Sequence, residues 1–133
     1  MDNEGAYTEI VFNWLGQAMK GGGKVKVFGN PDENIVDLVY VDDVVNAIVA
    51  MSRVSNKGTF NVATQKGTTL TELFNICKKV TGSDLQLEII DQGRTDVENK
   101  RIGDITRLRG LGWEPKVDVE EGILRSYEWL KTV

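Results

Sequence analysis

Histidine is absent from the 133-residue sequence, and cysteine occurs once. Without histidine, the chain cannot build a catalytic triad that uses imidazole as its base, nor a metal site with imidazole ligands. The lone Cys77 cannot form a disulfide within the chain. A reducing compartment, the cytoplasm, is therefore expected. We predict no metal site.

Positive charge and long apolar runs are also scarce. Sixteen Lys and Arg residues stand against twenty Asp and Glu residues, which gives a net charge of −4. Nucleic acids and anionic membrane surfaces require clustered basic side chains, and Lys24 with Lys26 are too few. No apolar run approaches the roughly 20 residues of a membrane span. We expect neither a nucleic-acid partner nor a membrane.

The patterns that are present predict an α/β fold in a single domain, residues 1–133. Apolar residues repeat with helical spacing over 7–19, 42–51, 70–80, 105–109 and 119–130. Short runs rich in strand-forming residues cover 25–28, 35–41, 59–63 and 85–90. The expected fold therefore has short strands and about five helices, without an internal repeat or linker.

Helix boundaries are marked by known signals. Thr69 with Glu72, and Asp118 with Glu121, have the spacing of capping boxes. Gly82 is expected to end the helix that contains Cys77, whose place in the apolar stripe predicts a core residue rather than a nucleophile. The run Gly21-Gly22-Gly23 follows a helix and precedes a strand, the reverse of a phosphate-binding P-loop, so we interpret it as a helix end.

One stretch carries a family resemblance. Val27-Phe28-Gly29, a polar loop, and then the run from Asp37 to Ala47 resemble the NAD-dependent epimerase/dehydratase family, the extended short-chain dehydrogenases/reductases that act on nucleotide sugars. The resemblance continues in the same order through three further parts of the chain, Gly58–Val62, Thr69–Leu73 and Leu111–Ile123. It covers nearly the whole sequence and implies the C-terminal, substrate-binding portion of such an enzyme.

The resemblance also implies what this portion does not contain. Family members bind NAD through a glycine-rich turn after their first strand and use a Tyr-x-x-x-Lys pair, and both belong to the N-terminal Rossmann half. Neither is visible here. Tyr127 and Lys131 have the spacing of that pair, but they lie in the closing helix, with Tyr127 on its apolar stripe. We predict no catalytic residue and no NAD bound to this chain alone.

The resemblance assigns four substrate-binding residues, with a UDP-sugar as the expected ligand. Lys26, Val27 and Phe28 occupy the strand that holds the nucleotide base, largely through backbone groups. Arg94 matches the arginine that contacts the diphosphate, for which a planar guanidinium is well suited. The alternatives are an ordinary edge strand with one core Phe, and a solvated surface charge at Arg94.

Two departures from the family weigh against substrate binding. Val36 stands where members commonly have a diphosphate-binding arginine, directly before Asp37. The loop Asn30–Asn34 carries two acidic residues, which repel phosphate. Asp37, Asp42 and Asp43 are interpreted as structural carboxylates, the last two at a helix start where Asp accepts free backbone N–H bonds.

The helix that begins at Asp42 is apolar on more than one side. By resemblance, this helix and the strand 59–63 lie against the large sheet of an NAD-binding domain. The chain is therefore expected to self-associate, or to pair with a separate NAD-binding domain, and to be inactive alone. The alternative hypotheses are a non-enzymatic module derived from an epimerase, kept for binding or assembly, and a fragment of an ordinary enzyme.

Overall fold

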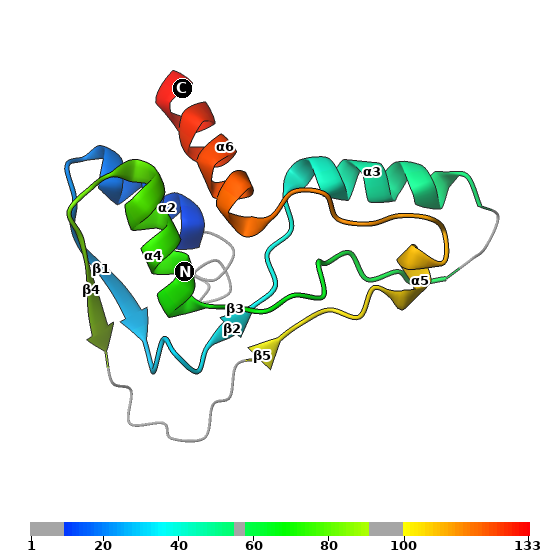
Figure 1. Cartoon of the computed structure of the whole chain (residues 1–133), viewed down its shortest axis with the longest axis horizontal. Coiled ribbons are helices and arrows are strands. Elements are labelled where there is room, and N and C mark those ends of the chain that lie inside the picture. The colour runs from blue at the N-terminus through cyan, green and yellow to red at the C-terminus, as the bar shows by residue number, and fades with distance from the viewer. Residues whose placement is uncertain (1–9, 55–57, 91–99) are drawn as a thin grey trace.

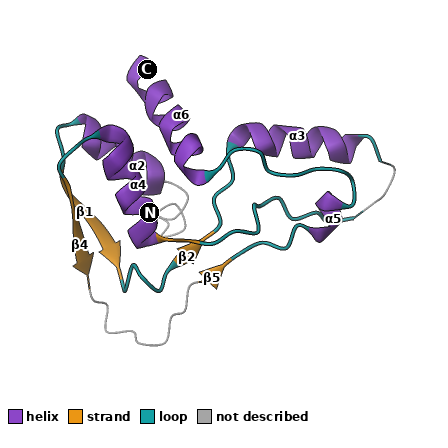
Figure 2. Cartoon of the chain, in the orientation of Figure 1, coloured by secondary structure: helices purple, strands orange, loops and turns teal. Residues whose placement is uncertain are grey.

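The fold divides into two groups of elements (Figure 1). In this computed structural model, the structure describes residues 10–54, 58–90 and 100–133. Helices α2 (Ile10–Met19), α4 (Leu70–Thr81) and α6 (Val119–Thr132) gather near the strands β1 (Gly23–Phe28) and β4 (Leu85–Ile90). Helices α3 (Val41–Ser52) and α5 (Thr106–Arg109) lie at the other end of the molecule, joined to the first group largely by loops (Figure 2). The predicted α/β class, with about five helices, is confirmed.

The first group encloses the larger core. Strands β1 and β4 pair in parallel, with Gly23 opposite Leu85 and Phe28 opposite Ile90. Helices α2, α4 and α6 pack on one another, and Trp14 of α2 meets Phe74 of α4 edge to face with ring centroids 5.9 Å apart. We call its buried residues the first cluster: Trp14, Leu15, Ala18, Val25, Val27, Leu70, Leu73, Phe74, Cys77, Leu85 and Ile123.

The predicted helix boundaries in this group are confirmed. The Thr69 hydroxyl accepts the Glu72 N–H at 3.1 Å, and the Asp118 carboxylate accepts the Glu121 N–H at 2.8 Å. Gly82 ends α4 in the left-handed conformation, with φ at 62°. Gly22, with φ at 106°, lies so close to the Asp84 carbonyl that an added Cβ would sit 2.8 Å from its oxygen. The glycine run therefore closes α2 against the start of β4.

A second, smaller sheet connects the two groups. Strand β2 (Ile35–Val36) lies between β3 (Thr68–Thr69), to which it is antiparallel, and β5 (Lys100–Arg101), to which it is parallel. The predicted strand over 35–41 is wrong beyond Val36, because the chain leaves the sheet at Asp37 and begins α3 at Val41.

Around α3 and α5 a second cluster forms, made of Ala47, Ala63, Ile105, Leu108 and Trp113. The predicted strand 59–63 packs on this cluster through Phe60 and Val62 but is not a strand. A strand exists only when a neighbour accepts and donates its ladder bonds. None of the strands in the described residues pairs with 59–63.

Helix α3 lies largely uncovered. Only Asp43 and Ala47 are buried, whereas Val41, Val45, Ile48 and Val49 are between 41% and 61% exposed. Their spacing places all four along one side of the helix. The side-chain cap predicted from Asp42 and Asp43 is wrong, because Tyr40 is the N-cap residue and makes no side-chain cap bond.

The helices in the described ranges are short or carry charged residues. None of them is both long and apolar enough to cross a bilayer.

Candidate functional site

The predicted base-binding residues lie at the end of β1. Val27 is buried in the first cluster at 3% exposure, so only its backbone can reach a ligand. Lys26 and Phe28 lie on the opposite face of the strand, where Phe28 is 49% exposed. Within the described residues, β1 pairs with β4 alone, which leaves backbone groups along its second edge without ladder bonds. This edge could hold a planar base through N–H and C=O groups.

Arg94 lies outside the described residues, and its predicted role stays a prediction. The structure does place the two ends of the segment that carries it. Ile90, at its beginning, lies opposite Phe28, and Lys100, at its end, lies opposite Ile35 of β2.

The loop between β1 and β2 is tied to the start of α4. The Asp32 carboxylate accepts the Thr71 hydroxyl at 2.5 Å, and the buried Asn34 accepts the Leu70 N–H through its carbonyl at 3.0 Å. Asp32 and Glu33 are both exposed. The acidic character predicted for this loop is therefore presented to solvent beside the end of β1.

The Asp37 carboxylate, which follows β2, is hydrogen-bonded to two distant segments of the chain. Its carboxylate accepts N–H bonds from Thr64 and Gln65, each at 2.8 Å, and from Gly103 at 3.2 Å, as well as the Thr64 hydroxyl. Gln65 adopts a positive φ of 61°, and its side chain accepts the Ile105 N–H at 3.2 Å. The structural role predicted for Asp37 agrees with these bonds, which fix the exit of β2 relative to the residues after β5.

Asp43 forms a second buried junction. It is 1% exposed, and its carboxylate accepts the backbone N–H groups of Lys116 and Val117 at 3.0 to 3.1 Å. The Trp113 indole donates to the Asp43 carbonyl at 3.0 Å. Asp43 is thus structural, as predicted, but it holds the segment before α6 rather than the first turn of α3.

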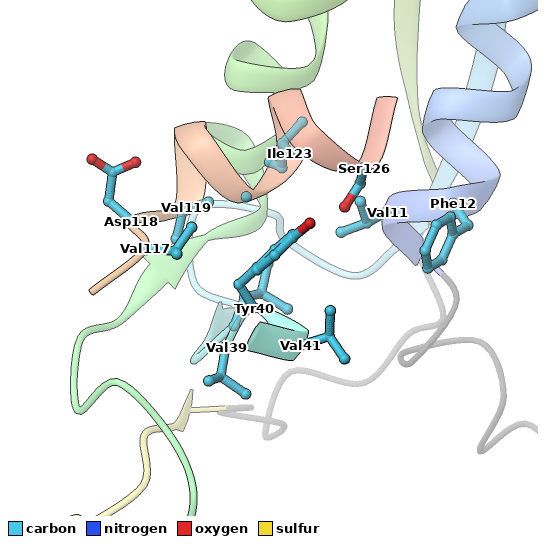
Figure 3. Close-up of a pocket in the computed structure, with 12 residues that line it drawn as sticks. Val11, Phe12, Val39, Tyr40, Val41, Val117, Asp118, Val119, Ile123 and Ser126 are labelled. Atoms are coloured by element: carbon cyan, nitrogen blue, oxygen red, sulfur yellow. The ribbon is translucent and has the colours of Figure 1, made fainter. Parts of the chain in front are cut away.

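A cavity of about 250 Å³ opens between α2, the start of α3 and the start of α6 (Figure 3). The Tyr40 ring lies at its centre, with its hydroxyl directed towards Ser126 and Val11. Most of the lining is apolar: Val11, Phe12, Leu38, Val39, Val41, Val117, Val119, Gly122 and Ile123, with Tyr40, Asp118 and Ser126 as the exceptions.

This cavity is a poor site for a diphosphate. No cationic side chain lines it, and its one carboxylate, that of Asp118, caps α6. None of Lys26, Val27 and Phe28 reaches it. Sequence reasoning did not find the cavity, because its walls come from three distant segments and contain no motif.

The groups associated with other chemistries have structural roles. Burial raises the pKa of the Cys77 thiol to about 12, so this residue is a protonated core side chain, as predicted. Tyr127 packs against the first cluster, and the Lys131 ammonium lies 4.8 Å from the centre of its ring. No group of three or more Cys, Asp or Glu residues in the described part of the chain could hold a metal ion.

Comparison with known proteins supports the resemblance found in the sequence. The model of the GDP-mannose 4,6 dehydratase family matches residues 2–126. The UDP-glucose 4-epimerase of Lactobacillus helveticus is 29% identical to the chain over 136 residues, which cover 94% of this chain and 41% of that protein.

Two solved structures share the fold. The UDP-glucose 4-epimerase of Thermotoga maritima, solved with UDP-glucose, is 35% identical with a TM-score of 0.82, covering 92% of this chain and 39% of that one. The UDP-glucose 4-epimerase of Thermus thermophilus, in complex with NAD, is 26% identical with a TM-score of 0.78, covering 92% and 40%. The chain therefore spans about two-fifths of the length of these relatives.

A family model that covers most of the chain, relatives matched over nearly its full length and the same fold in solved enzymes agree with one another. The chain belongs to the GDP-mannose 4,6-dehydratase family of NAD-dependent epimerases and dehydratases and corresponds to the C-terminal part of its members.

Proposed function

We propose that this chain is the nucleotide-sugar-binding portion of an NAD-dependent nucleotide-sugar epimerase or dehydratase, with a UDP-sugar as its ligand. The observation that carries the proposal is the match, over 92% of the chain, to an epimerase solved with UDP-glucose. The open edge of β1 supports it, because backbone groups there could bind the base. Lys26, Val27 and Phe28 would then hold the nucleoside, and Arg94 the diphosphate.

The chain alone is proposed to be inactive. Its residues do not fit NAD: the glycine run closes a helix, and the N–H groups of Gly21, Gly22 and Gly23 donate to carbonyls of the chain, so they are not free to bind a phosphate. The Tyr127–Lys131 pair packs on the core. When bound to a complete enzyme, NAD supplies reversible hydride transfer to the sugar, and this portion would hold the sugar nucleotide in position.

The uncovered face of α3 supports a partner for this chain. Exposed apolar side chains follow one side of α3, and the neighbouring segment 59–63 has no strand partner in the described residues. A helix and an adjacent unpaired segment are the parts of an α/β layer that lacks its sheet. We propose that an NAD-binding domain, or alternatively a second copy of the chain, covers this surface.

Calorimetric titration of the purified chain with UDP-glucose and with UDP tests the proposal. Binding of both ligands is expected, with an affinity that falls about tenfold in Arg94→Ala, because a charge-assisted hydrogen bond to phosphate is lost. Arg53→Ala, which removes an exposed arginine after α3, is the matched control and should bind like the wild type.

A non-enzymatic binding or assembly module is the second candidate function. It is favoured by Val36 in the family's arginine position and by the exposed Asp32 and Glu33 beside β1. Under this hypothesis the chain binds neither UDP-glucose nor UDP. A complete absence of heat in both titrations would therefore replace the first candidate by the second.

A further inference from the structure

The sheet of β1 and β4 has two outer edges, and neither meets another strand of the described residues. Strand β4 lies at the margin of the molecule (Figure 1). The Gly29 N–H donates to the Ile90 carbonyl, so the backbone groups of Ile90 point towards β1. Successive residues of a strand direct their backbone groups to alternate sides. The N–H and C=O groups of Leu85, Leu87 and Ile89 therefore point to the outer edge of β4.

The two edges differ in their protection against a further strand. By the same alternation, Lys24, Lys26 and Phe28 direct their backbone groups to the outer edge of β1. Lysine on an edge strand is a common protection against unwanted strand pairing, and β1 carries two. Strand β4, with the sequence LQLEII, has neither lysine nor proline, and its Ile89 is 57% exposed. The edge of β4 is therefore the one that is open to strand addition.

The sequence of β4 is complementary to itself in one register. An antiparallel pair of identical strands is symmetric about one residue, and the residues whose backbone groups point outward must pair with each other. A pair centred on Gln86 sets Asp84 opposite Glu88 of the other copy, and a pair centred on Glu88 sets two glutamates opposite each other. Both arrangements are repulsive. A pair centred on Leu87 sets Gln86 opposite Glu88 and opposes no like charges.

We propose that β4 is a dimerisation strand, which pairs antiparallel with β4 of a second copy of this chain about a two-fold axis at Leu87. The exposed Ile89 then lies opposite Leu85 of the second copy and gains an apolar neighbour. The two sheets become one four-stranded sheet with β1 at both ends, and the lysines of β1 prevent further growth, so the assembly closes as a dimer. Two short strands bury less area than a standard interface, so the dimer is reversible. The inference goes beyond the proposed function and does not depend on it, because the outer edge of β1 stays free for a ligand.

Substitutions at Gln86 test the register, because this exposed residue lies opposite Glu88 of the second copy and beside Lys24 of its own chain. In sedimentation velocity over a range of concentrations, Gln86→Glu should weaken the dimer about tenfold, since two like-charged pairs form, and Gln86→Lys should strengthen it by a similar factor. Thermal unfolding of the single chain should show the opposite order, because glutamate attracts Lys24 and lysine repels it. A dimer that is tighter for Gln86→Glu than for Gln86→Lys would follow fold stability instead and would overturn the inference.

Ile89→Lys tests the edge itself. It should weaken the dimer at least about tenfold, because β4 then carries the same protection as β1 and an unpaired charge enters the interface. Val45→Lys changes a comparably exposed apolar residue of α3 and is the matched control, which should dimerise like the wild type. Circular dichroism checks that both variants fold. Loss of the dimer in Val45→Lys but not in Ile89→Lys would assign self-association to α3 and refute the role of β4.

Amide hydrogen exchange measured by NMR locates the interface without a substitution. The N–H groups of Leu85, Leu87 and Ile89 should exchange more slowly as the protein concentration rises, whereas those of Lys24 and Lys26 should not change. A chain that is monomeric at every concentration, or slow exchange of the three β4 amides that does not depend on concentration, would overturn the inference. A chain that dimerises in this way but binds no UDP would reject the proposed function alone.

Discussion

Two neighbouring aspartates show how strongly environment decides the role of a residue. Asp43 is buried and accepts two backbone N–H groups that connect α3 to the segment before α6. Asp42 is exposed, and its carboxylate lies 3.7 Å from the Arg125 guanidinium. Screened surface pairs of this kind contribute little, whereas an unsatisfied buried donor is costly.

Asp43→Ala is therefore expected to lower the free energy of unfolding by about 3 kcal/mol, because the N–H groups of Lys116 and Val117 lose their hydrogen-bond acceptor. Asp42→Ala should change it by less than about 0.5 kcal/mol. Urea unfolding followed by circular dichroism measures both values. Similar losses in the two variants would contradict the buried junction described here.

Cys77 gives a prediction that depends on pH. The folded chain holds the thiol pKa near 12, above its ordinary value of 9.0, because burial disfavours the thiolate. The unfolded chain therefore releases this proton first, so the stabilisation is complete below about pH 9 and is lost as the pH rises from there towards 12. Cys77→Ala should lack this part of the alkaline pH dependence of unfolding.

The same burial predicts the reactivity of the thiol. At pH 8 a disulfide reagent such as DTNB should not label the native chain, because the thiol is protonated and fully buried. It should label the chain at once in urea. Rapid labelling under native conditions would show that the first cluster opens around α4.

At the scale of elements, α3 carries four exposed apolar side chains, those of Val41, Val45, Ile48 and Val49. Changing Val45 and Ile48 together to glutamate should leave folding almost unaffected, since both side chains face solvent. The same change should abolish association through this face, because an interface would then bury two unpaired carboxylates. Sedimentation velocity over a range of concentrations, with and without a separately expressed NAD-binding domain, measures the effect.

Asn46→Glu is the matched control, because it adds a charge at an exposed polar position of the same helix. It should associate like the wild type. If the wild-type chain stays monomeric and does not bind the NAD-binding domain, α3 is not an association surface.

The success of sequence-based prediction differed between helices and strands for a physical reason. A helix closes its hydrogen bonds within one segment, so the Thr69 cap and the Gly82 end sufficed to locate α4. A strand forms only when it pairs with another segment, and the local sequence does not show which segment that is. The ranges 25–28 and 85–90 were correct because they pair with each other, whereas 59–63 has strand-forming residues but no partner among the described strands.

At the scale of the whole molecule, the candidate site depends on contacts between distant parts of the chain. Sequence reasoning, aided by the family resemblance, identified β1 and named Asp37 as structural. It could not find that Asp37 binds Gly103, 66 positions away, or that Val36 lies opposite Arg101. Such pairings follow from the packing of two clusters and the small sheet between them, which no local pattern encodes.

The proposal that this chain binds the nucleotide sugar but not NAD leads to a final prediction, about stabilisation of the fold by ligands. A ligand that binds only the folded state raises the free energy of unfolding by about 2.7 kcal/mol at a concentration one hundred times its dissociation constant. UDP-glucose should therefore raise the melting temperature of this chain. NAD should leave it unchanged, because the N–H groups of the three consecutive glycines, which could otherwise bind a pyrophosphate, are already bonded to carbonyls of the chain.

ADP is the matched control ligand, since it carries a ribose and a diphosphate but a different base. If β1 recognises the base through its backbone edge, UDP should raise the melting temperature and ADP should raise it less. Equal shifts would mean that the diphosphate alone is bound and that β1 makes no selection. A shift with NAD would show that the chain holds a dinucleotide by itself, and the separation of sugar-nucleotide binding from redox chemistry would then fail.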